Sequence, residues 1–253
     1  MEHTREAFED NLYDIWARYF ECPSEIFRDS GLTIQPQDNL LGTGMVNLYR
    51  IGKQLIARCD DNVQNTLIDM MQNTILRNGL EHGMTEADIQ SEVMSQFDKT
   101  LEGEHLEWLF YLYPTDFKPY TSPDFDLRQL SATDKGSLDD LKSACTPDDV
   151  DEGWVHVTDE LVYGAFDGDK MVACASLFDW RGFGDPGVLV HPKYRQKGLG
   201  KAVVSPICAF VLEQGRVMDY RCDAKNLGSA GIAKSLGFTR YFEIEVFKLV
   251  DKA

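Results

Sequence analysis

The chain has 253 residues and a mass of 28.7 kDa, which fits one large domain or two small ones. Its composition, 43% hydrophobic and 26% charged, is that of a globular chain and excludes wholesale disorder. With 42 acidic against 25 basic residues the formal net charge is −17, which argues against nucleic acid and anionic lipid as partners. No apolar run approaches the roughly 18 residues of a membrane span.

The amino terminus and the cysteines bear on compartment and metal binding. Residues 1–6 are polar and acidic, unlike a secretory signal or an Arg-rich transit peptide. The six cysteines are widely spaced, with no C-x-x-C pair and no histidine at zinc-finger spacing. We therefore expect reduced, mostly buried thiols in a cytoplasmic protein without a metal site.

The acidity is concentrated in the first half of the chain. Residues 1–125 carry a net charge of −13, and residues 126–253 carry −4. Between the halves, the segment 113–123 is rich in proline and aromatic residues, and proline interrupts regular structure. The sequence therefore predicts two domains, an acidic helical and hairpin domain over 1–123 and a second domain over 124–253.

The first domain is predicted to open with a helix, because Phe8, Leu12, Ile15, Trp16 and Tyr19 recur on one helical face. The other elements expected here are a hairpin of strands 46–51 and 54–59 across Gly52-Lys53, and helices over 62–78, 85–96 and 104–112.

The second domain alternates strands and helices more clearly. Strands are expected over 125–130, 161–166, 171–178, 187–190, 217–223 and 241–249, and helices over 134–145, 198–213 and 229–236. The strands 161–166 and 171–178 should form a hairpin across Asp167-Gly168-Asp169-Lys170. This order predicts an α/β (α+β) fold in which helices flank a mixed central sheet.

The chemistry-bearing segment is the turn between strand 187–190 and the following helix. The turn contains two glycines, and four cations lie in or just after it: Lys193, Arg195, Lys197 and Lys201. No acidic residue occurs between Pro186 and Leu212. Because a helix N-terminus offers unpaired N–H groups and the positive end of its dipole, this turn is a predicted anion site.

Two common phosphate motifs do not fit this turn. A P-loop needs Ser or Thr after Gly-Lys, and here Ala202 follows Gly200-Lys201. The dinucleotide fingerprint needs a third small residue where Val203 stands. The pattern that does fit is R-x-x-G-x-G from Arg195 to Gly200, preceded by an apolar strand.

A second segment runs from Asn226-Leu227-Gly228-Ser229 to Leu236-Gly237-Phe238. Together the two segments resemble the coenzyme motifs of the GNAT superfamily of N-acetyltransferases, over about residues 125–250. More loosely, the whole chain resembles bacterial proteins in which a poorly defined N-terminal region precedes a GNAT domain. The resemblance implies the GNAT fold and acetyl-CoA as the co-substrate.

The resemblance also implies roles for individual residues. Backbone groups of Leu189 and Val190 would pair with the pantetheine like an added strand, and Arg195 would add charge beside the pyrophosphate. The Asn226 side chain would bind the pantetheine arm with Ser229 nearby; a helix N-cap is the alternative role of Asn226. The amides cradling the pyrophosphate would come from Gln196, Lys197, Gly198, Leu199, Gly200 and Lys201.

The catalytic groups are less clearly marked. Many members of the family have a tyrosine acid seven residues after the asparagine, where this chain has Ala233. Tyr220 and Tyr241 are candidate substitutes, with packing in the sheet as the alternative. Asp185 is the candidate general base, and an ordinary loop residue is the alternative; Asp223 and His191 are weaker candidates.

The resulting hypothesis is an acetyl-CoA-dependent N-acetyltransferase in which the amine attacks the thioester directly. The acidic first domain favours a cationic acceptor, either a small molecule or a peptide. The alternative is a coenzyme A-binding sensor or interaction module that has lost catalysis. The first domain is interpreted either as a degenerate GNAT half or as a dimerisation region of a homodimer.

Overall fold

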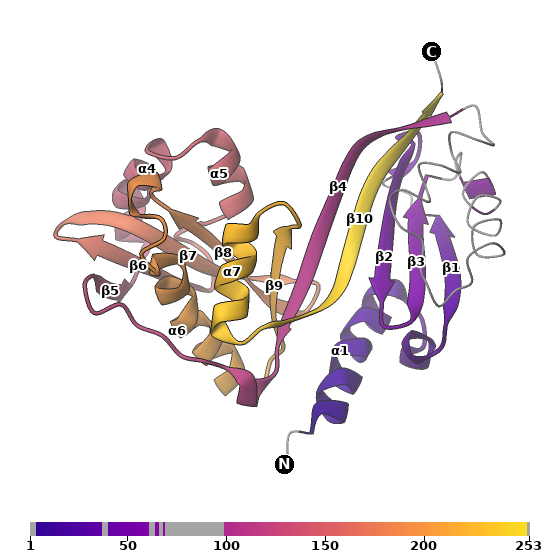
Figure 1. Ribbon diagram of the computed structural model, residues 1–253, viewed down its shortest axis with the longest axis horizontal. Helices are drawn as coiled ribbons and strands as arrows, with labels where there is room; N and C mark the ends of the chain where they lie inside the picture. The colour runs from indigo at the N-terminus through magenta and orange to yellow at the C-terminus, as the bar shows by residue number, and fades with distance from the viewer. Residues whose placement is uncertain (1–3, 37–39, 61–63, 66–67, 69–98, 252–253) are drawn as a thin grey trace. The chain divides into compact units, whose positions relative to one another are not determined.

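The computed structural model describes residues 4–36, 40–60, 64–65, 68 and 99–251 (Figure 1). The helices predicted over 62–78 and 85–96 lie almost entirely outside these residues. The chain divides into two compact units. Unit 1 comprises residues 1–19 and 110–240, and unit 2 comprises residues 20–109 and 241–253. These bounds differ from the predicted division at residues 123 and 124, because the first helix belongs to unit 1 and the last strand largely to unit 2.

Unit 2 is built on a hairpin that the sequence predicted correctly. Strands β2 (Met45–Ile51) and β3 (Gln54–Cys59) run antiparallel, and Ile51 pairs with Gln54 across a turn at Gly52 with φ of 59°. Strand β1 (Gly31–Pro36), which the sequence did not indicate, runs parallel to β3. On the other side of the hairpin, β10 (Thr239–Asp251) runs antiparallel to β2.

Unit 1 contains the second predicted domain as a mixed sheet with the order β9-β8-β7-β6-β5, and of the next strand in the order, β4, only residues 110–112 belong to unit 1. From β5 to β8 neighbouring strands are antiparallel, and β8 and β9 are parallel. The strands are β4 (Lys99–Leu112), β5 (Asp126–Gln129), β6 (Leu161–Asp167), β7 (Lys170–Trp180), β8 (Phe183–Val190) and β9 (Met218–Asp223). The fold is therefore mixed α/β, and the hairpin predicted across residues 167–170 is present.

Helices cover both faces of this sheet (Figure 1). They are α1 (Arg5–Phe20), α4 (Lys135–Ser143), α5 (Pro147–Gly153), α6 (Leu199–Glu213) and α7 (Leu227–Leu236). Only α5 was not expected among these. Its capping box, Thr146 with Asp149 three residues later and proline at the first helical position, was nevertheless readable in the sequence.

The short helix predicted over 104–112 is wrong, because these residues belong to the 14-residue strand β4. Leu109, Phe110, Tyr111 and Leu112 are all fully buried. Four consecutive buried side chains fit a strand that is covered on both faces, whereas an amphipathic helix would expose some of them. The spacing of the apolar residues alone did not separate the two alternatives.

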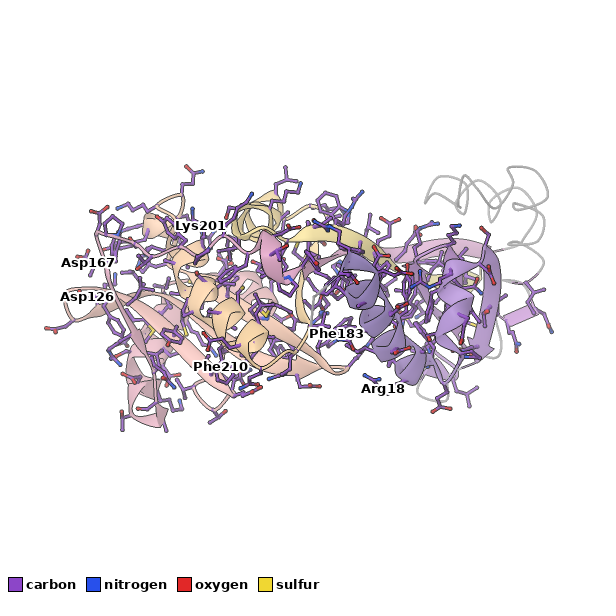
Figure 2. All side chains as sticks on the ribbon, turned by 90° about the horizontal axis from the view of Figure 1, so that it is seen from below. Arg18, Asp126, Asp167, Phe183, Lys201 and Phe210 are labelled. Carbon is purple, nitrogen blue, oxygen red and sulfur yellow. The ribbon has the colours of Figure 1, made fainter. Side chains whose placement is uncertain are left out.

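The first helix is anchored to unit 1 by Trp16. This side chain is fully buried, and its indole Nε1 donates a hydrogen bond of 3.1 Å to the hydroxyl of Tyr111. Its ring also lies 5.6 Å from the ring of Phe183, which Figure 2 labels at the start of β8. Aromatic burial of this kind supplies much of the packing energy of a core.

We predict that Trp16→Ala lowers the free energy of unfolding by about 3–5 kcal/mol, because it removes a large buried side chain and leaves Tyr111 without its indole donor. Asp14→Ala, at an exposed position of the same helix, is the matched control and should change it by less than about 0.5 kcal/mol. Chemical denaturation of both variants measures the difference, and equal losses would contradict this role of Trp16.

Candidate functional site

The site is organised by the separation of β8 from β9. The Gly184 N–H donates to the carbonyl of Val217 at 3.0 Å, and the register between the two strands consists of the pair Gly184–Met218. Beyond it, β8 continues to Val190 in pairing with β7 alone. One edge of β8 is therefore open along its C-terminal half.

The direction of the β8 backbone groups follows from two hydrogen bonds. His191 N–H donates to Val172 O of β7 at 2.9 Å, and Gly184 N–H donates toward β9. Since direction alternates along a strand, the backbone groups of Val188 and Val190 face the open edge, and those of Leu189 face β7. Of the two predicted pantetheine partners, Val190 has backbone groups in the required direction, and Leu189 does not. Val188, which was not predicted, shares the direction of Val190. The Leu189 side chain packs in the core.

Proline within β8 fits the same geometry. The backbone groups of Pro186 point in the same direction as those of Gly184 and Val188. The N–H that proline lacks would therefore lie on the side from which β9 has diverged. Proline is otherwise costly in the middle of a sheet, because it removes a ladder hydrogen bond. Because β8 and β9 no longer pair at this position, Pro186 removes no ladder hydrogen bond. The absence of an N–H helps to keep the edge open.

The predicted phosphate loop leads directly into α6. Gln196 and Gly198 adopt left-handed φ values of 64° and 76°, and Gly198 caps the helix without any side-chain hydrogen bond. The first amides of α6 have no carbonyl partner within the helix, so they are available to an anion. The predicted segment Gln196 to Lys201 therefore ends in helix N-terminal amides without a helical partner, as an anion site requires.

The two glycines of the loop have different roles. A Cβ atom on Gly198 would lie 2.9 Å from the Tyr120 hydroxyl, in addition to the strain of its positive φ. A Cβ atom on Gly200 would lie 2.5 Å from Cδ1 of Ile232 in α7. Gly200 therefore permits the close packing of α6 on α7, a role that the motif alone did not indicate.

The basic side chains of the loop are held by neighbours. Arg195 forms an ion pair of 2.6 Å with Asp149 of α5, and its Nε donates to Val190 O at 3.4 Å. Burial alone would raise the pKa of Asp149. The hydrogen bonds from Thr146 and the ion pair with Arg195 outweigh burial and lower this pKa. Arg195 thus ties the loop to α5 as well as carrying charge.

The lysines of the loop lie over aromatic rings. Lys201, labelled in Figure 2 at the start of α6, has its Nζ 3.6 Å from the ring centroid of Tyr120. Lys197 Nζ lies 4.9 Å from the ring of Tyr194. Such cation–π contacts restrain the long side chains without neutralising them. The loop keeps its positive potential.

Asn226 caps α7 and connects it to α5. Its Oδ1 accepts from the Ser229 N–H at 3.0 Å, and its Nδ2 donates to Glu152 at 2.9 Å. The N-cap role considered from the sequence is therefore present. The Ser229 hydroxyl in turn lies 2.9 Å from the hydroxyl of Tyr220.

Asp185 lies within β8 and not in the loop that was its alternative. Its side chain is 4% exposed and forms an ion pair of 2.7 Å with Nε of Arg221 on β9. Asp219, also on β9 and fully buried, has an oxygen 4.0 Å from the same nitrogen. Arg221 and Asp219 belong to no sequence motif, although their two-residue spacing on a predicted strand places them on one face.

The tyrosine candidates occupy different units. Tyr220 is buried, its ring packs against Phe238 at 5.7 Å, and burial raises its pKa, so its hydroxyl stays protonated. Tyr241 lies on β10 in unit 2, with its ring 5.9 Å from Phe242. Tyr220 is thus the candidate donor that shares unit 1 with the loop. Ala233, where the family tyrosine was expected, is fully buried.

His191 and Asp223 are placed beside the site. Asp223 accepts a hydrogen bond from the Lys225 backbone in the turn after β9. His191 is buried and lies 3.0 Å from Lys170 Nζ. Burial together with the charges of Lys170 and Lys193 lowers the pKa of His191, which favours the neutral ring.

Comparisons with known proteins assign the C-terminal half of the chain to a family. The family model described as the Acetyltransferase (GNAT) family matches residues 126–238, so the C-terminal half contains a GNAT domain. No curated protein matches the chain.

Solved GNAT structures are similar at low identity. A GCN5-related N-acetyltransferase from Sphaerobacter thermophilus superposes with a TM-score of 0.50 at 10% identity, over 78% of this chain and 72% of that one. A GNAT acetyltransferase from Colwellia psychrerythraea gives 0.48 at 14% identity, over 77% and 76%. A GCN5-related N-acetyltransferase from Kribbella flavida gives a TM-score of 0.45 at 16% identity, over 62% of this chain and 62% of that one. At 10% identity the likeness to the Sphaerobacter thermophilus protein concerns the fold alone.

The described residues contain no cluster of three or more His, Cys, Asp or Glu side chains arranged to hold a metal ion. None of the helices in the same part of the chain combines the length and apolar content needed to span a bilayer.

The lowered pKa of His191 predicts a pH dependence of stability. The unfolded chain binds a proton near pH 6.5 and the folded chain only at lower pH, so the free energy of unfolding should fall as pH drops below about 6.5. His191→Gln removes this contribution, and Lys170→Met should reduce it. Denaturation between pH 5 and 7.5 tests this; a slope for His191→Gln as steep as that of the wild type would contradict it.

Proposed function

We propose that the protein is an acetyl-CoA-dependent N-acetyltransferase that transfers the acetyl group to a primary amine. The observation that carries the proposal is the open edge of β8 leading into the uncapped N-terminus of α6. An extended amide-bearing arm and a pyrophosphate need these two features in this order. The GNAT family match over residues 126–238 supports the same reaction class.

The residues of this chain fit the coenzyme in chemical terms. Val188 and Val190 present backbone donors and acceptors on an open strand edge, as the amides of pantetheine require. The uncapped first turn of α6 and the nearby Lys197 and Lys201 suit the pyrophosphate. These features recognise coenzyme A without regard to the acceptor.

The proposed reaction is a direct attack. The neutral amine nitrogen forms a bond to the thioester carbonyl carbon, the carbon–sulfur bond breaks, and the thiolate takes a proton. The Val188 N–H, which faces the open edge and lies farther from the proposed pyrophosphate site than Val190, is the proposed donor to the oxyanion. Tyr220, protonated and hydrogen-bonded to Ser229, is the proposed proton source for the thiolate. One proton of the acceptor ammonium leaves to solvent before the attack. The second leaves the nitrogen as the amide forms and, through solvent, replaces the proton that Tyr220 gave to the thiolate.

Asp185 is the proposed carboxylate on the acceptor side. It lies in β8, five residues before Val190, and its side chain faces the sheet surface that α5 covers. A carboxylate there attracts a cationic acceptor, which agrees with the acidic character of the chain. The acceptor is therefore proposed to be an amine that is protonated in solution.

The second candidate is a module that binds coenzyme A without catalysis. The observation that favours it is Ala233, which provides no acid at the usual position. The hydroxyl pair of Tyr220 and Ser229 favours the enzyme, since it supplies another proton donor in the same unit.

Release of free thiol from acetyl-CoA in the presence of small amines, polyamines and basic peptides separates the two candidates. The proposal expects turnover with at least one cationic amine, and a drop of about 100-fold or more in kcat/KM for Tyr220→Phe. Submicromolar coenzyme binding without turnover on any amine would favour the binding module.

We predict that Gly198→Glu abolishes calorimetric binding of acetyl-CoA, because it adds a negative charge, a contact with Tyr120 and backbone strain at the helix cap. Gly231→Glu is the matched control, since a Cβ atom there meets nothing within 4 Å, and it should bind as the wild type does. Unchanged affinity in Gly198→Glu would remove the loop from the site.

A further inference from the structure

An ion pair joins the two diverging strands just beyond their last pairing. Asp185 follows Gly184 on β8, and Arg221 lies three residues after Met218 on β9. Their 2.7 Å contact is well shielded, with the arginine side chain 23% and the carboxylate 4% exposed. This contact therefore bridges the strands where their backbones no longer pair.

The guanidinium of Arg221 is held by a stack of aromatic and cationic side chains. It lies 4.0 Å from the ring centroid of Trp180, and the guanidinium of Arg181 lies 4.3 Å from the same ring. Arg181 is in turn 3.9 Å from the ring of Tyr19 and 5.7 Å from Trp16. The stack thus extends from α1 to Asp185 within unit 1, and it restrains Arg221 in one position.

Charged and titratable groups of β9 and β4 lie near Asp185. Arg221 and Asp219 face it from β9, and the neighbouring Tyr111 of β4 and Tyr220 of β9 feel its charge. Burial, Asp219 and Asp185 raise the pKa of Tyr111, so this hydroxyl stays neutral. Arg221 is the cation in direct contact with Asp185, and an adjacent guanidinium stabilises the ionised form of a carboxyl group.

We propose that Arg221 is a positioning residue that keeps Asp185 ionised. Asp185 then binds the acceptor ammonium through its charge and does not accept a proton from it. A carboxylate bound by a guanidinium is a weak base, so it attracts and orients the cation while solvent takes the proton. The inference rests on the proposed function, and it deepens it by assigning the acceptor-side carboxylate a binding role.

The first test measures Asp185 itself and needs no activity. Carboxyl ¹³C NMR titration should show the pKa of Asp185 about 1–3 units higher in Arg221→Met than in the wild type. Arg221→Lys keeps the charge and should restore most of the difference. Arg216→Met is the control, because Arg216 has a similar exposure of 25% but pairs with Glu160 at 2.7 Å. An unchanged Asp185 titration in Arg221→Met would overturn the inference.

The second test uses the acetyl transfer assay. Asp185→Asn should raise KM for a cationic amine at least tenfold with a smaller change in kcat, as expected for lost ground-state binding. In Arg221→Met, kcat/KM should show a second acid inflection, in addition to the one caused by protonation of the amine, that the wild type and Arg216→Met lack. A loss in kcat alone for Asp185→Asn would contradict the anchor role. Absence of turnover in the wild type would count against the proposed function, while the NMR titration would still decide the inference.

Discussion

The structure of the site depends on the separation of β8 and β9 after the pair Gly184–Met218. A parallel pair that continued would use the backbone groups of Val188 and Val190 within the sheet. Because the strands separate, these groups face an open edge, and Pro186 can stand in the middle of a strand without loss of a ladder bond. The same separation places Asp185 and Arg221 where a side-chain ion pair replaces backbone pairing.

Side-chain contacts from both faces then stabilise the opening. On one face, α5 is joined to the phosphate loop through Asp149 and Arg195, and to α7 through Glu152 and Asn226. On the other face, Gly200 lets α6 approach Ile232 of α7. The net charge of −17 is compatible with the proposed anionic co-substrate, because the loop keeps its lysines over Tyr120 and Tyr194.

The sequence predicted those parts of the fold that local signals specify. Signals that act over a few positions, such as turn residues, glycines and apolar runs, mark these elements. They are the hairpins at Gly52 and Gly168, the helix that begins after Gly198 and the strand 187–190. Leu109 to Leu112 were misassigned because four buried residues fit either element until the sheet around them is known. Within the site, the loop was predicted from its motif.

The contacts that join distant segments were not predictable in the same way. The partnership of Arg221 with Asp185 joins residues 36 positions apart, and that of Arg195 with Asp149 links the loop to a helix that was overlooked. A charged residue on a strand or helix has many partners of opposite sign along the sequence. Only the tertiary structure selects one of them. The packing of Gly200 against Ile232 likewise joins segments that are distant in the sequence, so the motif did not indicate it.

Amide hydrogen exchange at the open edge of β8 tests the central claim most directly. On addition of acetyl-CoA, exchange of the Val188 and Val190 amides should slow by at least tenfold, because the coenzyme arm takes them as an added strand. The Leu189 amide, which faces β7, is the internal control and should change little. Bound acetyl-CoA with no added protection of Val188 and Val190 would contradict the account.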